Sequence, residues 1–186
     1  MKSLILAFLL LLFFNSTSVK GEFVVYKTSE DLKNKKGEKY DDFHSYTWVG
    51  EHVTLVAVRN NEKHKIKCAD IYAVVYKDQF FRIHKDDIRE TPARLMNVGK
   101  LCYYENGLVH MVMLRDNSKE AVMSRGFGCY FSKDVNSKIE PLIGNKKIVK
   151  QQKIVYPEYS ELFDNIKNMW LPVQIWPVVQ QFEAKK

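Results

Sequence analysis

Short segments of alternating hydrophobicity constrain the fold of this chain more than any other feature. Over residues 22–133 they recur every 8–12 residues, separated by turn-forming residues and with no helical pattern between them. The clearest segment is His52–Arg59, in which Val53, Leu55 and Ala57 fall on one face. Such spacing is typical of antiparallel strands joined by short turns and argues against βαβ units.

Two dipeptides predict tight turns between these strands. Lys77-Asp78 lies between the segments Ile71–Tyr76 and Gln79–His84 and predicts a two-residue hairpin turn. Asn106-Gly107 is the stronger signal, because both residues readily adopt the positive φ angles of a type I′ turn. We therefore expect a second hairpin over residues 101–114.

The segments around these strands carry weaker signals. Residues 60–63 predict another reversal, and residues 120–124 predict a strand that pairs back. Thr28 is followed by acidic residues, which predicts one or two helical turns over residues 28–32. Residues 33–45 have no periodicity, and we expect a loop there.

The C-terminal third has helical periodicity. After Pro157, large apolar residues recur at the spacing of one helix face, and two acids lie in the first turn. These apolar residues are Tyr159, Leu162, Phe163, Ile166, Met169 and Trp170. A shorter helix is expected over residues 145–152, and residues 171–182 form either a kinked continuation or a separate helix.

These patterns predict an α+β single domain over residues 22–186. Its main part is an antiparallel β-meander sheet of about seven to nine strands, either open or curled toward a barrel. A C-terminal helical segment, at about residues 145–184, covers one face of the sheet.

The first 21 residues have the layout of a secretory signal peptide. Lys2 precedes an apolar run from Leu4 to Phe14, and small polar residues follow. The run is shorter than the about 20 residues that a membrane-spanning helix needs. Cleavage is expected after Gly21, with Ser18 as the second option. No cysteine lies near the end of the run, so lipid anchoring is not expected. We predict a soluble secreted or periplasmic protein with no transmembrane segment.

Composition and charge exclude several classes of protein. The chain has 186 residues, of which 46% are hydrophobic and 27% charged, so it is neither disordered nor of low complexity. Signal cleavage removes two lysines and no acid, which lowers the net charge from +7 to +5. Basic residues occur in scattered groups that read as solvated faces, and export argues against a nucleic-acid partner.

The three cysteines are the strongest candidates for a reactive site in the sequence. Cys68, Cys102 and Cys129 each lie in a predicted strand. We expect buried thiols that pack as small hydrophobic groups. The alternative is a disulfide between two of the three. No neighbouring residue in the sequence is placed to activate a thiol.

No motif predicts a catalytic, cofactor or metal site. The five histidines and three cysteines lack ligand spacing, and no phosphate-binding loop or nucleophile elbow is present. His84 stands beside Asp86 and Asp87, but an exposed turn explains that cluster equally well. We therefore name no catalytic residue, no cofactor and no metal.

Three stretches resemble a family of small secreted proteins of Gram-negative bacteria. They are Tyr26–Asp31 (Y-K-T-x-x-D), residues 65–83 and residues 99–107, and the resemblance extends over about residues 23–135. It implies export from a bacterial cell and carries no activity, because none is known for those proteins.

These observations favour a non-catalytic function. We expect an exported binding or structural protein with an envelope or extracellular partner. The alternative is a secreted hydrolase whose active site is dispersed along the sequence, and a deep pocket with converging His, Asp or Cys side chains would distinguish the two.

Overall fold

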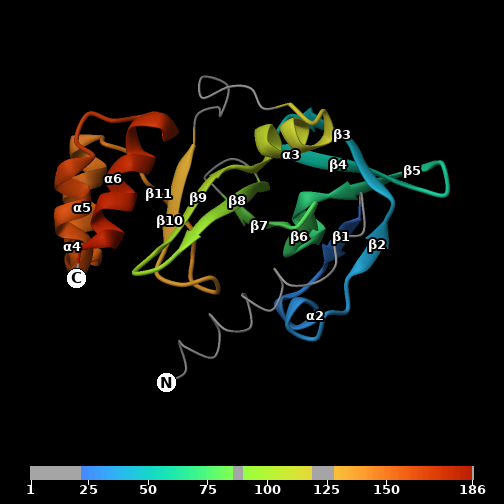
Figure 1. Cartoon of the computed structure of the whole chain (residues 1–186), viewed down its shortest axis with the longest axis horizontal. Coiled ribbons are helices and arrows are strands. Elements are labelled where there is room, and N and C mark those ends of the chain that lie inside the picture. Colours follow the sequence, from blue (N-terminus) through green and yellow to red (C-terminus); the bar gives the residue numbers. More distant parts are fainter. Residues whose placement is uncertain (1–21, 86–89, 119–127, 186) are drawn as a thin grey trace.

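The computed structural model describes residues 22–85, 90–118 and 128–185 and has an α+β architecture (Figure 1). Eight antiparallel strands form one sheet in the order β11-β10-β9-β8-β7-β6-β1-β2. They are β1 (Phe23–Tyr26), β2 (Glu38–Tyr40), β6 (Ala73–Tyr76), β7 (Gln79–Lys85), β8 (Glu90–Val98), β9 (Cys102–Asn106), β10 (Cys129–Ser132) and β11 (Glu140–Pro141). The six strands β6–β11 follow one another in chain order, which confirms the predicted meander, and the sheet is open.

A second, three-stranded sheet has the order β3-β4-β5. Its strands are β3 (Asp42–Val49), β4 (His52–Arg59) and β5 (Glu62–Lys67). The predicted strand over His52–Arg59 is confirmed. The loop expected over residues 33–45 is wrong, because β2 and the start of β3 lie there. Most side chains of β2 and β3 are exposed or half-buried, so these strands lack the apolar alternation that would have revealed them.

Two hairpin turns use non-glycine residues with positive φ. Lys77 and Asp78 have φ angles of 47° and 60°, and they join β6 to β7 as predicted. Asn60 and Asn61 have φ angles of 53° and 64° and join β4 to β5. Positive φ at both central residues is the mark of a type I′ turn, whose twist matches that of paired strands.

The hairpin predicted at Asn106-Gly107 is wrong. Asn106 has a φ of −55° and caps the N-terminus of helix α3 (Gly107–Arg115), accepting hydrogen bonds from two backbone N–H groups of the first turn at 3.1 and 3.5 Å. Gly107 is required for close approach, since a Cβ atom there would lie 2.5 Å from the backbone oxygen of Pro92. A helix cap and a tight strand contact therefore account for this dipeptide.

The remaining helices follow the predicted pattern in part. They are α2 (Ser29–Lys33), α4 (Lys146–Val155), α5 (Ser160–Asn165) and α6 (Pro172–Ala184), with 3-10 turns η1 (Cys68–Asp70) and η2 (Pro157–Tyr159). Thr28 and Asp31 form a capping box on α2, which confirms that start signal. The strand predicted at residues 120–124 lies outside the described residues.

The helix predicted from Pro157 to Trp170 is shorter than expected. Asn168 has a φ of 64°, and its backbone N–H donates to the backbone oxygen of Gly144 at 2.9 Å. The N–H of Gly144 in turn donates to the oxygen of Met169 at 2.8 Å. This backbone pairing ends the helical segment before Trp170, whose side chain is exposed rather than on the buried face.

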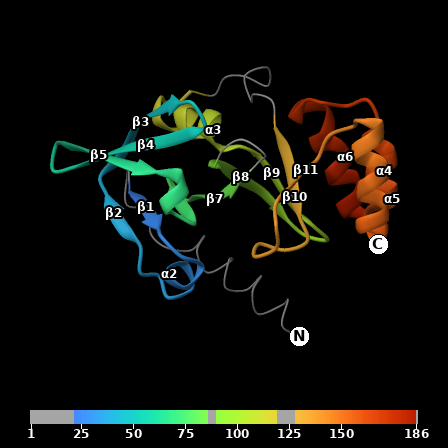
Figure 2. The same ribbon diagram turned by 180° about the vertical axis from the view of Figure 1, so that it is seen from behind.

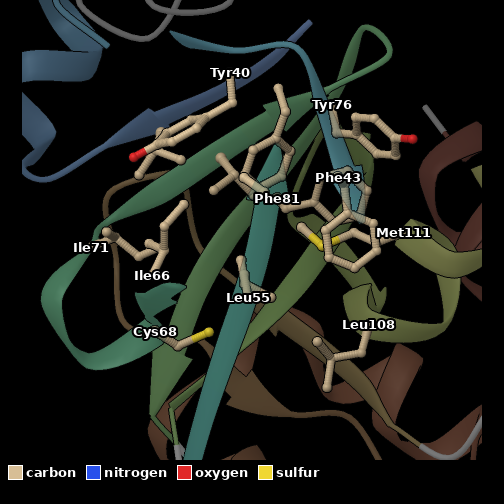
Figure 3. Packing of buried hydrophobic residues seen from close by; sticks show 14 of the residues in the cluster. Tyr40, Phe43, Leu55, Ile66, Cys68, Ile71, Tyr76, Phe81, Leu108 and Met111 are labelled. Carbon is tan, nitrogen blue, oxygen red and sulfur yellow. The ribbon is translucent and has the colours of Figure 1, made fainter. Parts of the chain in front are cut away.

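Different elements pack against the two ends of the large sheet and form two separate hydrophobic cores. The first core lies between the two sheets and α3 (Figure 3), and it includes Phe43, Leu55, Tyr76, Phe81 and Met111. The second core lies between β9, β10 and the helices α4, α5 and α6. It includes Tyr103, Phe131, Leu162, Phe163 and Ile175. Figures 1 and 2 show the three-stranded sheet and these helices at opposite ends of the molecule.

Both cores lie on one face of the large sheet. Phe81 pairs with Arg94, Arg94 with Glu105, and Glu105 with Cys129 across successive strands. Directly paired residues in an antiparallel sheet point to the same face. A row of polar side chains therefore crosses this face between the two cores.

Candidate functional site

The polar row is built from three strands and one helix. Glu105 on β9 is fully buried, and its Oε2 lies 3.0 Å from Nε2 of the buried His110 on α3. Nδ1 of His110 lies 2.8 Å from Nη1 of Arg94 on β8. The other terminal nitrogen of Arg94 donates to the side-chain oxygen of Gln79 on β7 at 2.7 Å. The network thus places a carboxylate, an imidazole and a guanidinium in line across the sheet.

The hydrogen-bond donors of Arg94 determine the tautomer of His110. A guanidinium can only donate, so Nδ1 of His110 must accept from it. The imidazole proton therefore lies on Nε2 and points to Glu105. Because both ring nitrogens are occupied by protein groups, this histidine is arranged as a link between Arg94 and Glu105.

Tyr103 extends the row toward the second core. Its hydroxyl oxygen lies 3.2 Å from Oε1 of Glu105 and 3.4 Å from Sγ of Cys129. Burial, together with the charges of Cys129 and Glu105, raises the pKa of Tyr103 far above its usual value. Tyr103 therefore stays a neutral phenol at physiological pH.

The three thiols are free and buried. Burial raises the pKa of Cys68 and Cys129 to about 12 and the pKa of Cys102 to about 11. Only the thiolate is a nucleophile, so none of these cysteines is activated at neutral pH. Cys102 and Cys129 lie in strands as predicted, whereas the strand prediction for Cys68 is wrong, because this residue begins the 3-10 turn η1.

The opposite face of the sheet contains His84. Its Nε2 lies 3.2 Å from the hydroxyl of Thr91, and its ring packs 4.2 Å from that of Tyr130. His84 is buried between these neighbours, while Asp86 and Asp87 lie outside the described residues. In the described part of the chain, no group of three His, Cys, Asp or Glu residues is placed to hold a metal ion.

An open groove lies between β8 and α6. It has a volume of about 450 Å³ and is lined by Met96, Asn97, Trp176, Gln180, Glu183 and Ala184. Apolar and amide side chains therefore meet in a single concave surface that solvent reaches.

Tyr103 and the β8–β9 turn hold the α6 side of the groove in place. The indole of Trp176 stacks on the ring of buried Tyr103, with ring centres 5.2 Å apart and planes inclined by 17°. The carboxylate of Glu183 accepts hydrogen bonds from the backbone N–H groups of Lys100 at 2.8 Å and Leu101 at 3.2 Å. Both side chains are thus fixed before any ligand arrives.

The β8 side of the groove has an unused hydrogen-bond donor. The side-chain nitrogen Nδ2 of Asn97 is buried and has no partner among the described residues. A buried donor without a partner lowers the folding stability by about 1–3 kcal/mol, so such groups are rare in native proteins. Asn97 thus lines the groove, while this nitrogen itself is closed to solvent.

No helix in the described part of the chain is long and apolar enough to cross a membrane. Comparisons with known proteins add no relative. The chain matches no protein family, no curated protein and no solved structure.

Neither the polar row nor the groove was predicted from the sequence. Glu105 and His110 are close in sequence, but their pairing depends on α3, which was mistaken for a strand. Met96 and Trp176 are far apart along the chain, and only the packing of α6 beside β8 brings them together.

Proposed function

We propose that this chain is an exported, non-catalytic binding protein whose ligand occupies the groove between β8 and α6. The observation that carries this proposal is the groove itself: an aromatic ring held by a buried stack, next to amide and carboxylate side chains in the same lining. A small-molecule site typically combines apolar surface with a few fixed polar groups. Export rests on the signal-like sequence of the first 21 residues.

The lining favours a neutral, polyhydroxylated ligand such as a sugar. The face of an aromatic ring packs against the C–H groups of a sugar ring, while hydroxyl groups need both donors and acceptors around them. Asn97 and Gln180 supply amide donors and acceptors, and Glu183 supplies a carboxylate. A highly charged ligand fits less well, because Glu183 is the only charged residue among the described residues of the lining.

The hydrolase alternative has less support. The titratable groups that converge in the described residues are Glu105, His110 and Arg94, and the first two are almost completely buried. An acid–base pair must lie within hydrogen-bond reach of its substrate or of one water. Here the ring nitrogens of His110 contact protein groups on both sides.

A glycan array probed with residues 22–186 tests the proposal. We expect the wild-type protein to bind at least one glycan and Gln180→Ala to lose most of that signal. Gln180 is exposed, so its replacement leaves the fold intact. Trp176→Leu should also lose the signal, whereas Trp170→Leu, an exposed tryptophan outside the groove, should keep it. Equal signals from all four proteins, or none from wild type, would refute the proposal.

A further inference from the structure

Strand β5 (Glu62–Lys67) forms one edge of the three-stranded sheet. It pairs with β4 from Thr54↔Lys67 to Arg59↔Glu62, and its other side pairs with no strand among the described residues. An edge strand presents unpaired backbone N–H and C=O groups that can accept a further strand. β5 lies at the end of the molecule opposite to α4, α5 and α6 (Figures 1 and 2), far from the groove.

Three lysines lie on one face of this edge. Lys63, Lys65 and Lys67 alternate along β5 and are all exposed, whereas His64 and Ile66 point to the first core. Within the described residues, none of the three lysines forms an ion pair. The edge therefore combines free backbone groups with a row of uncompensated positive charge.

The sheet holds this edge in a fixed shape. Asn60 and Asn61 close the β4–β5 hairpin in a type I′ turn, and the N–H of Asn60 donates to a carboxylate oxygen of Asp41 at 2.8 Å. Next to the turn, Arg59 stacks over the ring of Tyr40 and donates to the backbone oxygen of Lys39 at 2.8 Å. A partner strand would therefore bind without first ordering β5.

We propose that β5 is the docking edge for an extended acidic segment of a partner protein. The segment would pair with the free backbone groups of β5 as a fourth strand, which is the β-augmentation mode of recognition. Its alternate residues, glutamate or aspartate, would lie opposite Lys63, Lys65 and Lys67, where opposite-charge cross-strand pairs are favourable.

Charge selects this occupant over a second copy of the chain. Pairing of β5 with β5 of another copy would bring two rows of lysines together on the same face, and facing like charges are destabilising. An anionic polymer with no peptide backbone would use the lysines alone and leave the edge groups unpaired. An acidic strand is the partner that uses both features.

The test uses residues 22–186 and a fluorescent synthetic peptide that alternates glutamate with valine. Binding is followed by fluorescence anisotropy and hydrogen exchange by mass spectrometry. The variant Lys63→Gln/Lys65→Gln/Lys67→Gln removes the charge row. The matched control, Lys146→Gln/Lys147→Gln/Lys150→Gln, removes the same charge from exposed positions of α4. Thermal melts verify that both variants fold.

We expect the peptide to bind wild type and the α4 control equally, and to bind the β5 variant about tenfold more weakly. We also expect it to slow amide exchange within residues 62–67. The proposal is overturned if the peptide does not bind, if both variants lose affinity equally, or if exchange in β5 is unchanged on binding. It is also overturned if polyphosphate, which has no peptide backbone, binds and protects these amides equally well.

Discussion

Arg94 and His110 meet at 2.8 Å between the two cores, and the guanidinium donates to Nδ1 of the imidazole. This contact places the remaining imidazole proton toward the buried carboxylate of Glu105. The carboxyl group of Glu105 and the guanidinium of Arg94 therefore lie on one face of the sheet with His110 between them. The row joins β7, β8 and β9 to α3.

Removing the carboxylate of Glu105 should lower the stability of the fold. Glu105→Ala leaves two buried donors, Nε2 of His110 and the hydroxyl of Tyr103, without their acceptor, and we expect the free energy of unfolding to fall by about 2–5 kcal/mol. Glu140→Ala is the control, since Glu140 forms a surface ion pair with Lys138 at 2.9 Å and should cost no more than about 1 kcal/mol. Urea denaturation measures both losses, and equal losses would contradict a buried, hydrogen-bonded row.

Asn106 should behave as a helix cap and not as a turn residue. Asn106→Ala removes the acceptor of two backbone N–H groups and should cost about 1 kcal/mol, whereas Asn106→Ser should restore most of that loss. Gly107→Ala should cost about 1–3 kcal/mol, because its Cβ would overlap the backbone of Pro92. A thermal melt of Gly107→Ala that matches wild type would show that α3 does not approach β8 this closely.

The buried thiols predict a loss of stability in alkali. An unfolded cysteine loses its proton near pH 8.5, while the folded protein keeps it until about pH 11 to 12. Above about pH 9 the unfolded state therefore binds fewer protons than the native state, so stability falls as the pH rises. The expected slope is about 1 kcal/mol per pH unit for each thiol.

Denaturation at several pH values measures this slope, and Cys68→Ala should reduce it relative to wild type. The same burial predicts that iodoacetamide modifies no cysteine in the folded protein and all three in denaturant. One cysteine that reacts quickly in the folded protein would contradict the assignment and revive the hydrolase alternative.

The signal peptide prediction has a direct test. Mass spectrometry of protein exported by a Gram-negative host should find an N-terminus at Glu22, or at Val19 if the second cleavage site is used. The small residues before each site account for this choice. Exported protein that still begins with Met1 would contradict it.

The sequence predicted the parts of the fold in which side-chain alternation and local turns agree. His52–Arg59 alternates strictly, and Lys77-Asp78 lies between two well-defined strands, so both were placed correctly. Asn106-Gly107 misled because the same dipeptide suits a type I′ turn and a helix N-terminus, and only the contact with Pro92 decides between them.

The remaining features depend on contacts between residues that are distant in the sequence. The helical pattern after Pro157 continues to Trp170, but Gly144 pairs with the backbone of residues 168–169 and ends the helix earlier. Likewise, no local pattern could show that Trp176 stacks on Tyr103 or that Asn97 faces the same groove.

Titration of Trp176 fluorescence tests the binding function most directly. In a Trp48→Phe/Trp170→Phe variant, Trp176 is the only tryptophan left and reports on the groove. With glucose, galactose, mannose and N-acetylglucosamine as probes, we predict that at least one changes its emission saturably. The same titration of this variant with Gln180→Ala added should then give a much weaker response. Emission that no sugar changes, or a response that Gln180→Ala leaves intact, would contradict the proposed groove.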